Sequence, residues 1–545
     1  MNRPSSAAAS GDRNLRILAL AGLILFILTN WWPVITGTLS EQDLKVPISK
    51  EKAAETAKQF IQKQYGPAET LNTYVYYQAQ KDVIGYLQRQ DLFEAYTDRW
   101  VKRYPVEYYA VEVTEPESNV RYTVNVHLSE AKVVSWNSSL PSEGSESGLK
   151  AAESFLKKQG YAADKAILDR EESGDGVFTF LVSKFDMGGS RLSLEVRTDA
   201  SGVITGFTPS FTLPAEHTSW IAKQDRAAAW MTYAGNLLTG AIMAIAAIVY
   251  VIIGRKQVSF ARGIFLTAVY LIVNMVNNAN MYPAYKAILG SADASGTAIA
   301  SVMLIQNLFF FGMSVMLYFS FISGDQLWRQ RGIRVWARWQ EADYGEHVMT
   351  AMKRGYLIGL VILGLQQVLF IAEGKVFHVW STTDPVSSPY NMLWLWVFPF
   401  AAWGAAIEEE AVYRMFGIAL FAKLFRNPMV AAVLPTLFWA FGHTQYPIYP
   451  TYTRVIELLV IGLVFSYVFL KYGLITAIFS HAVMDSILMG LSILPYGGLN
   501  TMAGIAHLAM PAIVAYVIYR LHRRFRKSPP QELPQMPAPP RPAGT

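Results

Sequence analysis

Runs of apolar residues long enough to cross a membrane constrain this chain more than any other feature. About twenty such residues span a bilayer core, and they must be helical because no water is present to bond the backbone. Ten runs are predicted to be transmembrane helices, at 15–38, 227–253, 259–281, 297–322, 355–373, 390–424, 428–446, 454–471, 474–492 and 500–520. With 52% hydrophobic residues, the chain is predicted to be an α-helical polytopic membrane protein with the lipid bilayer as its surroundings.

Basic residues gather at the borders of these runs, which predicts how the chain is oriented. They lie in segments 1–16, 255–258, 324–356, 421–427, 471–473 and 520–527. Cytoplasmic loops carry an excess of Lys and Arg, and cytoplasmic placement of all six segments alternates correctly through ten crossings. Both termini are therefore predicted to be cytoplasmic, with residues 39–225 outside a cell membrane. The formal charge of +6 reflects these anchors and does not indicate a nucleic-acid partner.

Five regions follow from this pattern. Residues 1–14 are predicted to be a cytoplasmic N-terminus. Residues 15–38 are predicted to be a signal-anchor helix, because the run is long and lacks a clear cleavage site; a cleaved signal peptide is the alternative. Residues 39–225 are extracytoplasmic, and 226–527 form the membrane domain. The proline-rich segment 528–545 is expected to be a disordered tail.

The extracytoplasmic segment 39–225 repeats one pattern. Amphipathic helices are predicted at 58–64 and 153–159, and alternating strands follow each helix, at 109–113, 122–128 and 131–136, then at 178–182, 192–196 and 202–207. This repeat predicts an α+β domain of two tandem modules. The pattern resembles the PepSY family, which implies that the domain regulates a peptidase. A purely structural ectodomain is the alternative.

Ionisable side chains within the later apolar runs are the strongest sign of function. A charge at the bilayer centre costs roughly 2.5–3.5 kcal/mol on insertion scales, so such residues usually face a protein interior. The six residues are Glu409, Glu410, Arg414, His443, His481 and Asp485. They predict one buried polar site.

Helical spacing suggests separate roles for the charged residues of the first run. Glu410 and Arg414 are four residues apart and share a helix face, which predicts a buried ion pair. Glu409 projects about 100° away from Glu410 and is free to act as a general base on water. A hairpin would bring His443, on the next run, to Glu409.

The pair His481 and Asp485, again four residues apart, allows two interpretations. Both could donate hydrogen bonds to an oxyanion, or both could join Glu409 and His443 as ligands of a Zn²⁺ ion. The chain has no cysteine, no H-E-x-x-H and no G-x-S-x-G. These absences exclude a thiol nucleophile, a zincin and the serine nucleophile elbow.

The three motifs, in this order, resemble the CPBP intramembrane protease family, which includes the Ras-converting CAAX proteases and bacteriocin-immunity relatives. They are E-E-x-x-x-R ending at Arg414, aromatic-x-x-x-His ending at His443, and His-x-x-x-Asn/Asp starting at His481. Arg414 fixes the frame, so Glu408 lies outside the motif. The resemblance covers 390–490 strongly and the helices from 227 weakly.

The resemblance implies roles for the site residues. Glu409 and His443 would activate water, while His481 and Asp485 would stabilise the tetrahedral intermediate. Trp439 stands where the family usually has Phe, which we expect to be a tolerated packing change. Asp485 stands where many members have Asn, and an Asp donates a hydrogen bond only when protonated. Asp485 must therefore hold a proton or act through His481.

The sequence thus predicts an intramembrane endopeptidase of metallo- or glutamic type. The resemblance implies prenylated C-a-a-X substrates, whereas the external domain is typical of a bacterial plasma membrane, where a membrane-anchored protein or peptide is expected. A catalytically silent scaffold or an immunity or regulatory protein is the alternative. A transporter is disfavoured because no second half matches 390–490. Glu373, beside an external loop, is expected to be solvated, and His507 to be a core residue.

Overall fold

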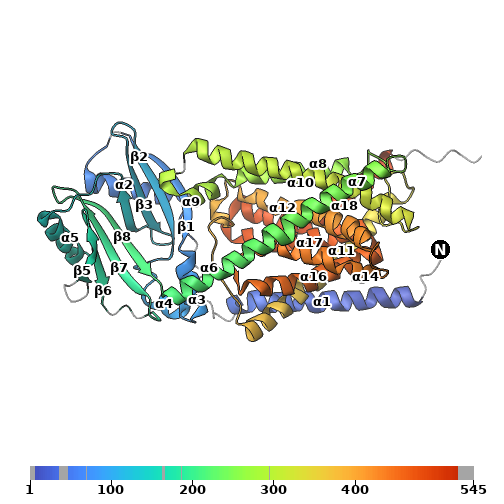
Figure 1. The fold of residues 1–545 in the computed structure, drawn as a ribbon, viewed down its shortest axis with the longest axis horizontal. Coiled ribbons are helices and arrows are strands. Elements are labelled where there is room, and N and C mark those ends of the chain that lie inside the picture. Colours follow the sequence, from blue (N-terminus) through green and yellow to red (C-terminus); the bar gives the residue numbers. More distant parts are fainter. Residues whose placement is uncertain are drawn as a thin grey trace, which may run out of the picture.

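The computed structural model describes residues 6–35, 47–68, 70–161, 166–183, 185, 187–293 and 295–525. These residues form an elongated molecule with a β-sheet domain at one end and a bundle of long helices at the other (Figure 1). The tail predicted at 528–545 lies outside the described residues.

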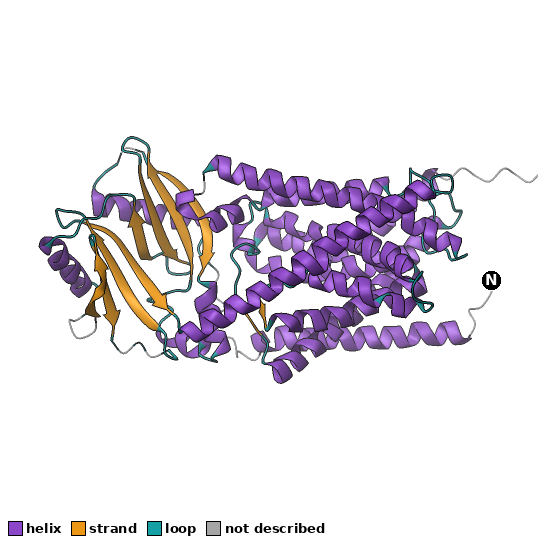
Figure 2. Cartoon of the chain, viewed as in Figure 1, coloured by secondary structure: helices purple, strands orange, loops and turns teal. Residues whose placement is uncertain are grey.

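The sheet domain contains eight strands and four helices. Its strands are β1 (Asn72–Ala79), β2 (Glu107–Glu115), β3 (Val120–His127), β4 (Val133–Ser138), β5 (Ala166–Gly174), β6 (Val177–Val182), β7 (Arg191–Thr198) and β8 (Ile204–Thr212). Its helices are α2 (Lys50–Tyr65), α3 (Lys81–Arg89), α4 (Phe93–Arg99) and α5 (Glu146–Lys158). All eight strands belong to one antiparallel sheet, in the order β1-β2-β3-β4-β8-β7-β6-β5. The strands lie together at one end of the molecule, away from the long helices (Figure 2).

The two predicted halves are present, but they share this single sheet. Each half begins with a helix whose first turn is capped by a serine: Ser49 accepts from the N–H of Lys52, and Ser145 from that of Gly148. The halves join where β4 pairs with β8, with Trp136 opposite Phe207. An edge strand leaves backbone N–H and C=O groups unpaired. Pairing β4 of one half with β8 of the other gives these groups hydrogen-bond partners.

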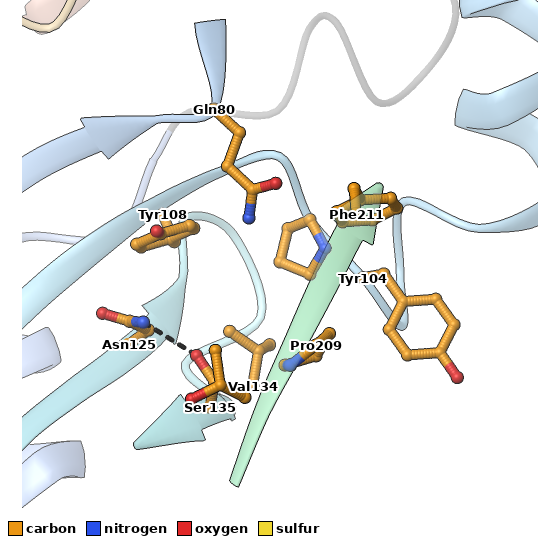
Figure 3. Close-up of a pocket in the computed structure, with 10 residues that line it drawn as sticks. Gln80, Tyr104, Tyr108, Asn125, Val134, Ser135, Pro209 and Phe211 are labelled. Atoms are coloured by element: carbon orange, nitrogen blue, oxygen red, sulfur yellow. Dashed lines mark hydrogen bonds between the residues drawn. The ribbon is translucent and has the colours of Figure 1, made fainter. Parts of the chain in front are cut away.

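Alternation along the strands points successive side chains to opposite faces of the sheet, one of which is strongly apolar. On the apolar face, side chains such as Val111 and Val124 are buried in one core with α2 and α5. On the opposite face, a small cavity of about 30 Å³ lies beside Asn125, Ser135 and Pro209 (Figure 3). A cavity of that size holds water and is far smaller than a typical ligand pocket.

The membrane part consists of long helices and a shorter, interrupted central segment. The long helices are α1 (Ser6–Ile35), α6 (Ala215–Trp230) continuing through η1 (Met231–Leu238) into α7 (Thr239–Ile253), α8 (Ile264–Asn280), α9 (Tyr282–Asp293), α10 (Gly296–Gln330), α11 (Tyr344–Phe377), α16 (Thr451–Tyr472), α17 (Leu474–Ile493) and α18 (Gly498–Phe525). The central segment is η2 (Pro389–Asn391), η3 (Leu395–Phe400), α12 (Ala401–Glu409), η4 (Glu410–Gly417), α13 (Ile418–Phe421), α14 (Pro428–Ala431) and α15 (Val433–Phe441), and η5 (Leu494–Tyr496) follows α17.

Among the described residues, seven helices are long and apolar enough to cross a membrane, or eight if the pair α8–α9, bent by 51°, is one span. The chain is a multi-pass membrane protein, but this count is lower than the ten predicted runs. The run 390–424 is divided among 3-10, α and π turns, with Pro399 inside η3. The run 428–446 contains only a short helix, Pro428–Phe441. Both runs were predicted to be spans because they are long and apolar, but the helices within them are broken. These two breaks account for the difference between eight spans and the ten predicted runs.

Two observations show how the membrane helices are arranged. Helix α1 packs along α11, where the Thr29 hydroxyl donates to Oε1 of Gln367 at 2.9 Å. The loop after α7 and helix α14, both next to basic segments, lie at the end of the bundle opposite the sheet domain (Figure 1). The predicted orientation requires these basic segments to lie at the end of the bundle away from the sheet domain. Which end faces the cytoplasm and which the exterior remains a prediction.

Candidate active site

The E-E-x-x-x-R motif lies where α12 changes into the π-helical turn η4, at Glu410. π-turns are rare and occur frequently at functional sites. Small and apolar neighbours let this segment enter the centre of the bundle, and Glu410 and Arg414 are both 0% exposed. The three charges of the motif therefore face protein and not lipid.

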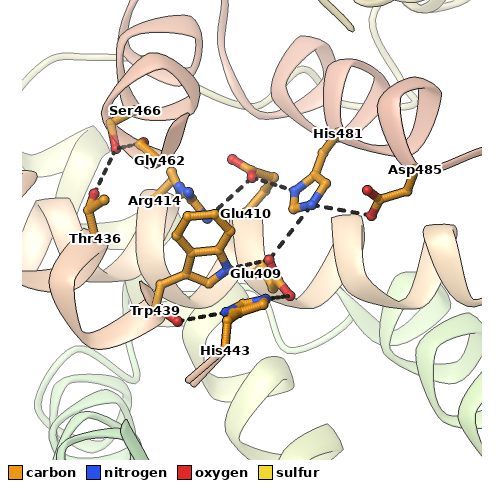
Figure 4. A network of polar contacts seen from close by, with 10 residues as sticks. All are labelled: Glu409, Glu410, Arg414, Thr436, Trp439, His443, Gly462, Ser466, His481 and Asp485. Atoms are coloured by element: carbon orange, nitrogen blue, oxygen red, sulfur yellow. Dashed lines mark hydrogen bonds and ion pairs between the residues drawn. The ribbon is translucent and has the colours of Figure 1, made fainter. Parts of the chain in front are cut away.

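Glu410 has two partners. Its Oε1 lies 3.4 Å from Nη1 of Arg414, as the spacing predicts, and 2.9 Å from Nδ1 of His481 (Figure 4). The Arg414 guanidinium has no hydrogen-bond partner within the described part of the chain, but it lies 4.4 Å from the ring centroid of Trp439 and 5.5 Å from that of Phe465. Ion pairing and cation–π contact thus compensate its charge.

Glu409 lies between the two histidines. Nε2 of His443 is 3.8 Å from its Oε1, and Nε2 of His481 is 3.7 Å from its Oε2 (Figure 4). The indole N–H of Trp439 donates a hydrogen bond to Oε2. Glu409 retains some exposure, 13% of its side chain, so it is the carboxylate of the motif pair that another molecule can reach.

The His443 ring has a defined tautomer. Its Nδ1 lies 2.9 Å from the carbonyl oxygen of Trp439, which can only accept a hydrogen bond, so Nδ1 carries the proton. In a neutral ring, Nε2 then presents a lone pair toward Glu409.

The third motif is positioned by a tight turn between α16 and α17. Gly473 has φ of +85°, and the backbone of Val335 would lie 2.6 Å from any Cβ there, so glycine is needed for this turn. The turn places the His481 ring parallel to Phe465, with the centroids 4.5 Å apart. Nε2 of His481 also lies 3.4 Å from Oδ2 of Asp485. All six predicted residues therefore belong to one cluster.

Sequence reasoning missed two contributions to this cluster. Trp439 was expected to be a packing substitution, yet its N–H bonds the proposed base, and Phe has no such donor. Glu410 was paired only with Arg414, yet it also orients His481. A tryptophan in place of phenylalanine adds an N–H donor, and this difference could have indicated the first contribution from the sequence. The second joins residues 71 positions apart, and no local pattern indicates it.

A glycine makes room for Trp439. A Cβ at Gly462 would lie 2.8 Å from Cζ3 of this indole and 2.5 Å from Cγ2 of Thr436. The neighbouring hydroxyl of Ser466 donates to the Gly462 carbonyl at 2.8 Å (Figure 4). The glycine of the third segment thus lets α15 and α16 approach closely enough for Trp439 to reach Glu409.

The donor types in the cluster suit zinc, but their arrangement does not form a ligand set. Among the residues that the structure describes, no group of three or more His, Asp or Glu side chains is placed to hold one metal ion. We therefore derive no step through a metal.

Three ionisable residues that the sequence analysis left outside the site also lie in the bundle. Glu408, outside the motif, is buried, and its Oε1 has no hydrogen-bond partner among the residues that the structure describes. Glu373 was expected to be solvated, which is wrong: it is 5% exposed, because α16 covers the end of α11. His507 is a core residue as predicted, with its ring centroid 4.5 Å from that of Phe400, but its Nδ1 has no hydrogen-bond partner among the described residues.

Comparison with protein families supports the motif assignment. Residues 391–487 match the family model described as type II CAAX prenyl endopeptidase Rce1-like. The match runs from η2 into α17 and contains all six predicted site residues. Comparison with curated proteins and with solved structures finds no match. The family match, together with a polar cluster buried among membrane helices, indicates intramembrane peptidase activity.

Proposed function

We propose that this protein is an intramembrane endopeptidase in which Glu409 and His443 activate water. The observation that carries the proposal is the position of Glu409, whose two oxygens face Nε2 of His443 and Nε2 of His481 at 3.8 and 3.7 Å. These distances are too long for direct hydrogen bonds. A water oxygen placed between Glu409 and His443 can bond to both groups.

The reaction begins with proton transfer from water to the Glu409 carboxylate. Nε2 of His443 accepts the second hydrogen bond of the water and orients its lone pair. The oxygen attacks the carbonyl carbon of the peptide bond and forms a tetrahedral oxyanion. Glu409 then returns the proton to the amide nitrogen, the C–N bond breaks, and the products are a carboxylic acid and an amine.

His481 is the proposed oxyanion donor. Its Nδ1 faces Glu410, so the ring donates from that side, and a second proton on Nε2 would bond the developing oxyanion. Three carboxylates face this ring, from Glu409, Glu410 and Asp485, and they compensate the positive charge. Asp485 contributes through His481, or directly when it carries a proton.

The substrate we propose is a membrane-anchored protein or peptide. The reacting groups lie within the helical bundle, and a soluble chain would have to leave water to reach them. A peptide already held in the bilayer avoids this desolvation cost. The eight-stranded domain has a repeated helix-and-strand pattern that resembles PepSY modules. In this proposal it regulates the reaction.

The test compares two neighbouring glutamates. Membranes carrying the wild-type protein, Glu409→Gln or Glu408→Gln are compared by quantitative proteomics, and a peptide from any accumulating protein is then cleaved by purified protein. Glu409→Gln keeps the side-chain volume and loses the proton acceptor, so turnover should fall by about 10²–10⁴-fold. Glu408→Gln should retain turnover, because Oε1 of Glu408 has no hydrogen-bond partner.

Wild-type turnover in Glu409→Gln would show that the base is wrongly assigned. A catalytically silent scaffold would give no accumulating substrate in any variant. Equal loss in both variants would indicate a general effect of removing buried carboxylates.

A further inference from the structure

His443 is the one proposed catalytic residue whose backbone lies outside a helix. It follows the end of α15 and belongs to a segment, residues 442–451, that we call the His443 turn. Within this turn its ring lies parallel to Tyr446, with the centroids 6.1 Å apart at an angle of 14°. The position of Nε2 relative to Glu409 therefore depends on whatever fixes the His443 turn.

Helix α6 holds one side of the turn. The Asp225 carboxylate accepts from the Tyr449 hydroxyl at 2.8 Å, and the Gln224 side chain accepts from the Thr451 N–H at 3.0 Å. The Thr444 hydroxyl donates to the carbonyl of Ala228 at 3.1 Å. These bonds reach the turn from the helix that directly follows the last strand of the sheet.

Strand β9 (Trp380–Ser381) holds the other side. It pairs antiparallel with β10 (Ile448–Tyr449) of the turn. The Thr382 N–H donates to the carbonyl of Pro447 at 3.1 Å. The Trp380 ring stacks on Tyr449, with centroids 4.8 Å apart and an angle of 28°. Trp380 is therefore the largest side chain that β9 places against the turn.

The sheet domain also contacts Trp380, through α3. A Cβ at Gly85 would lie 2.8 Å from Cζ3 of this indole, so only glycine lets the helix approach so closely. The Thr382 hydroxyl donates to the carbonyl of Lys81 at 2.6 Å. The Arg89 guanidinium lies 4.1 Å from the ring centroid of Trp220, which lies 6.2 Å from Trp380. Trp380 thus separates α3 from Tyr449 and contacts both.

We propose that Trp380 is a positioning residue through which the sheet domain holds His443 at Glu409. The inference rests on the proposed function and gives the sheet domain a defined role, which is to brace one wall of the active site. A misplacement of about 1 Å can reduce the rate of an enzyme by about 10²-fold. Disturbing this contact should therefore lower turnover although no substituted residue touches Glu409.

The test uses four full-length variants in the cleavage assay described above. Trp380→Ala removes the ring, and Gly85→Leu keeps Trp380 but displaces it. Both should lower kcat by about 10–100-fold with little change in KM. Trp380→Phe keeps a stacking ring and should restore most of kcat. Lys286→Met is the matched control, because it breaks the ion pair with Glu112, a contact between the sheet domain and α9 away from the His443 turn.

A second measurement does not depend on activity. Amide hydrogen exchange, read by mass spectrometry, should accelerate in a peptide covering 442–451 in Trp380→Ala and Gly85→Leu. It should not change in a peptide covering 474–493, which carries His481, or in Lys286→Met. Protection of that second peptide also shows that the variants are folded.

Unchanged exchange of the His443 turn in both Trp380→Ala and Gly85→Leu would overturn the inference. Faster exchange with wild-type kcat would overturn it as well, because the turn would then be loosened without effect on the reaction. Glu409→Gln is measured alongside: if it retains activity, the proposed function fails, and the role of Trp380 in catalysis fails with it. If only Glu409→Gln loses activity, the proposed function stands and the inference fails.

Discussion

The buried pair of Glu410 and Arg414 allows the sharpest prediction about stability. Glu410→Gln keeps an acceptor for the Nδ1–H of His481, 2.9 Å away, and removes only the negative charge. Arg414 then remains 0% exposed, with two aromatic rings but, among the described residues, no carboxylate within ion-pair distance. Removing one partner of a buried ion pair costs about 3–5 kcal/mol. We expect Glu410→Gln to lose that amount of unfolding free energy.

Arg414→Met should cost a similar amount, because it leaves the Glu410 carboxylate buried. The double variant, which combines Glu410→Gln with Arg414→Met, removes both charges. Replacing a whole buried ion pair by uncharged groups often leaves the free energy of unfolding nearly unchanged. It should therefore lose no more than either single variant, far less than the sum of the two.

The assay is reversible unfolding of the purified protein in mixed detergent micelles, followed by tryptophan fluorescence. Glu346→Gln, on the exposed first turn of α11, is the matched control and should stay within about 0.5 kcal/mol of wild type. Additive losses in the double variant would refute the reasoning, because they would show that the two charges do not compensate each other. Losses below about 1 kcal/mol in both single variants would show that water reaches the pair.

Three further predictions concern the catalytic groups. Trp439→Phe keeps the ring beside Arg414 but removes the N–H donor to Glu409, so it should change kcat and the pH profile of turnover. The free energy of unfolding should fall by no more than about 1.5 kcal/mol. An unaltered pH profile would contradict a role for this bond. Asp485→Asn supplies a permanent donor and should retain turnover, whereas Asp485→Ala should lose it; equal loss in both would show that the carboxylate itself is required. Dialysis against a chelator should leave turnover intact, with well under one zinc per chain by elemental analysis; stoichiometric zinc that is lost in His443→Ala would establish a metal mechanism instead.

The sequence alone determined where the buried polar cluster of this protein lies. Charged residues in apolar runs are costly in a bilayer, so Glu409, Arg414 and His481 could be assigned to a polar interior before any fold was known. Helical period then paired Glu410 with Arg414, because residues four apart share a face of an α-helix. Strand alternation likewise indicated the two halves of the sheet domain. These inferences succeed because each depends on local geometry.

The tertiary structure decided which groups meet across elements. It joined the two halves at β4 and β8 into one sheet, interrupted the run 390–424, and buried Glu373 under α16. It also brought the Trp439 indole to Glu409 and set Trp380 between α3 and the His443 turn. Each of these contacts joins segments far apart in the chain, and each depends on how closely helices pack, down to a missing Cβ at Gly85. No periodicity in the sequence carries that information, because packing between elements is set by the shapes of both surfaces.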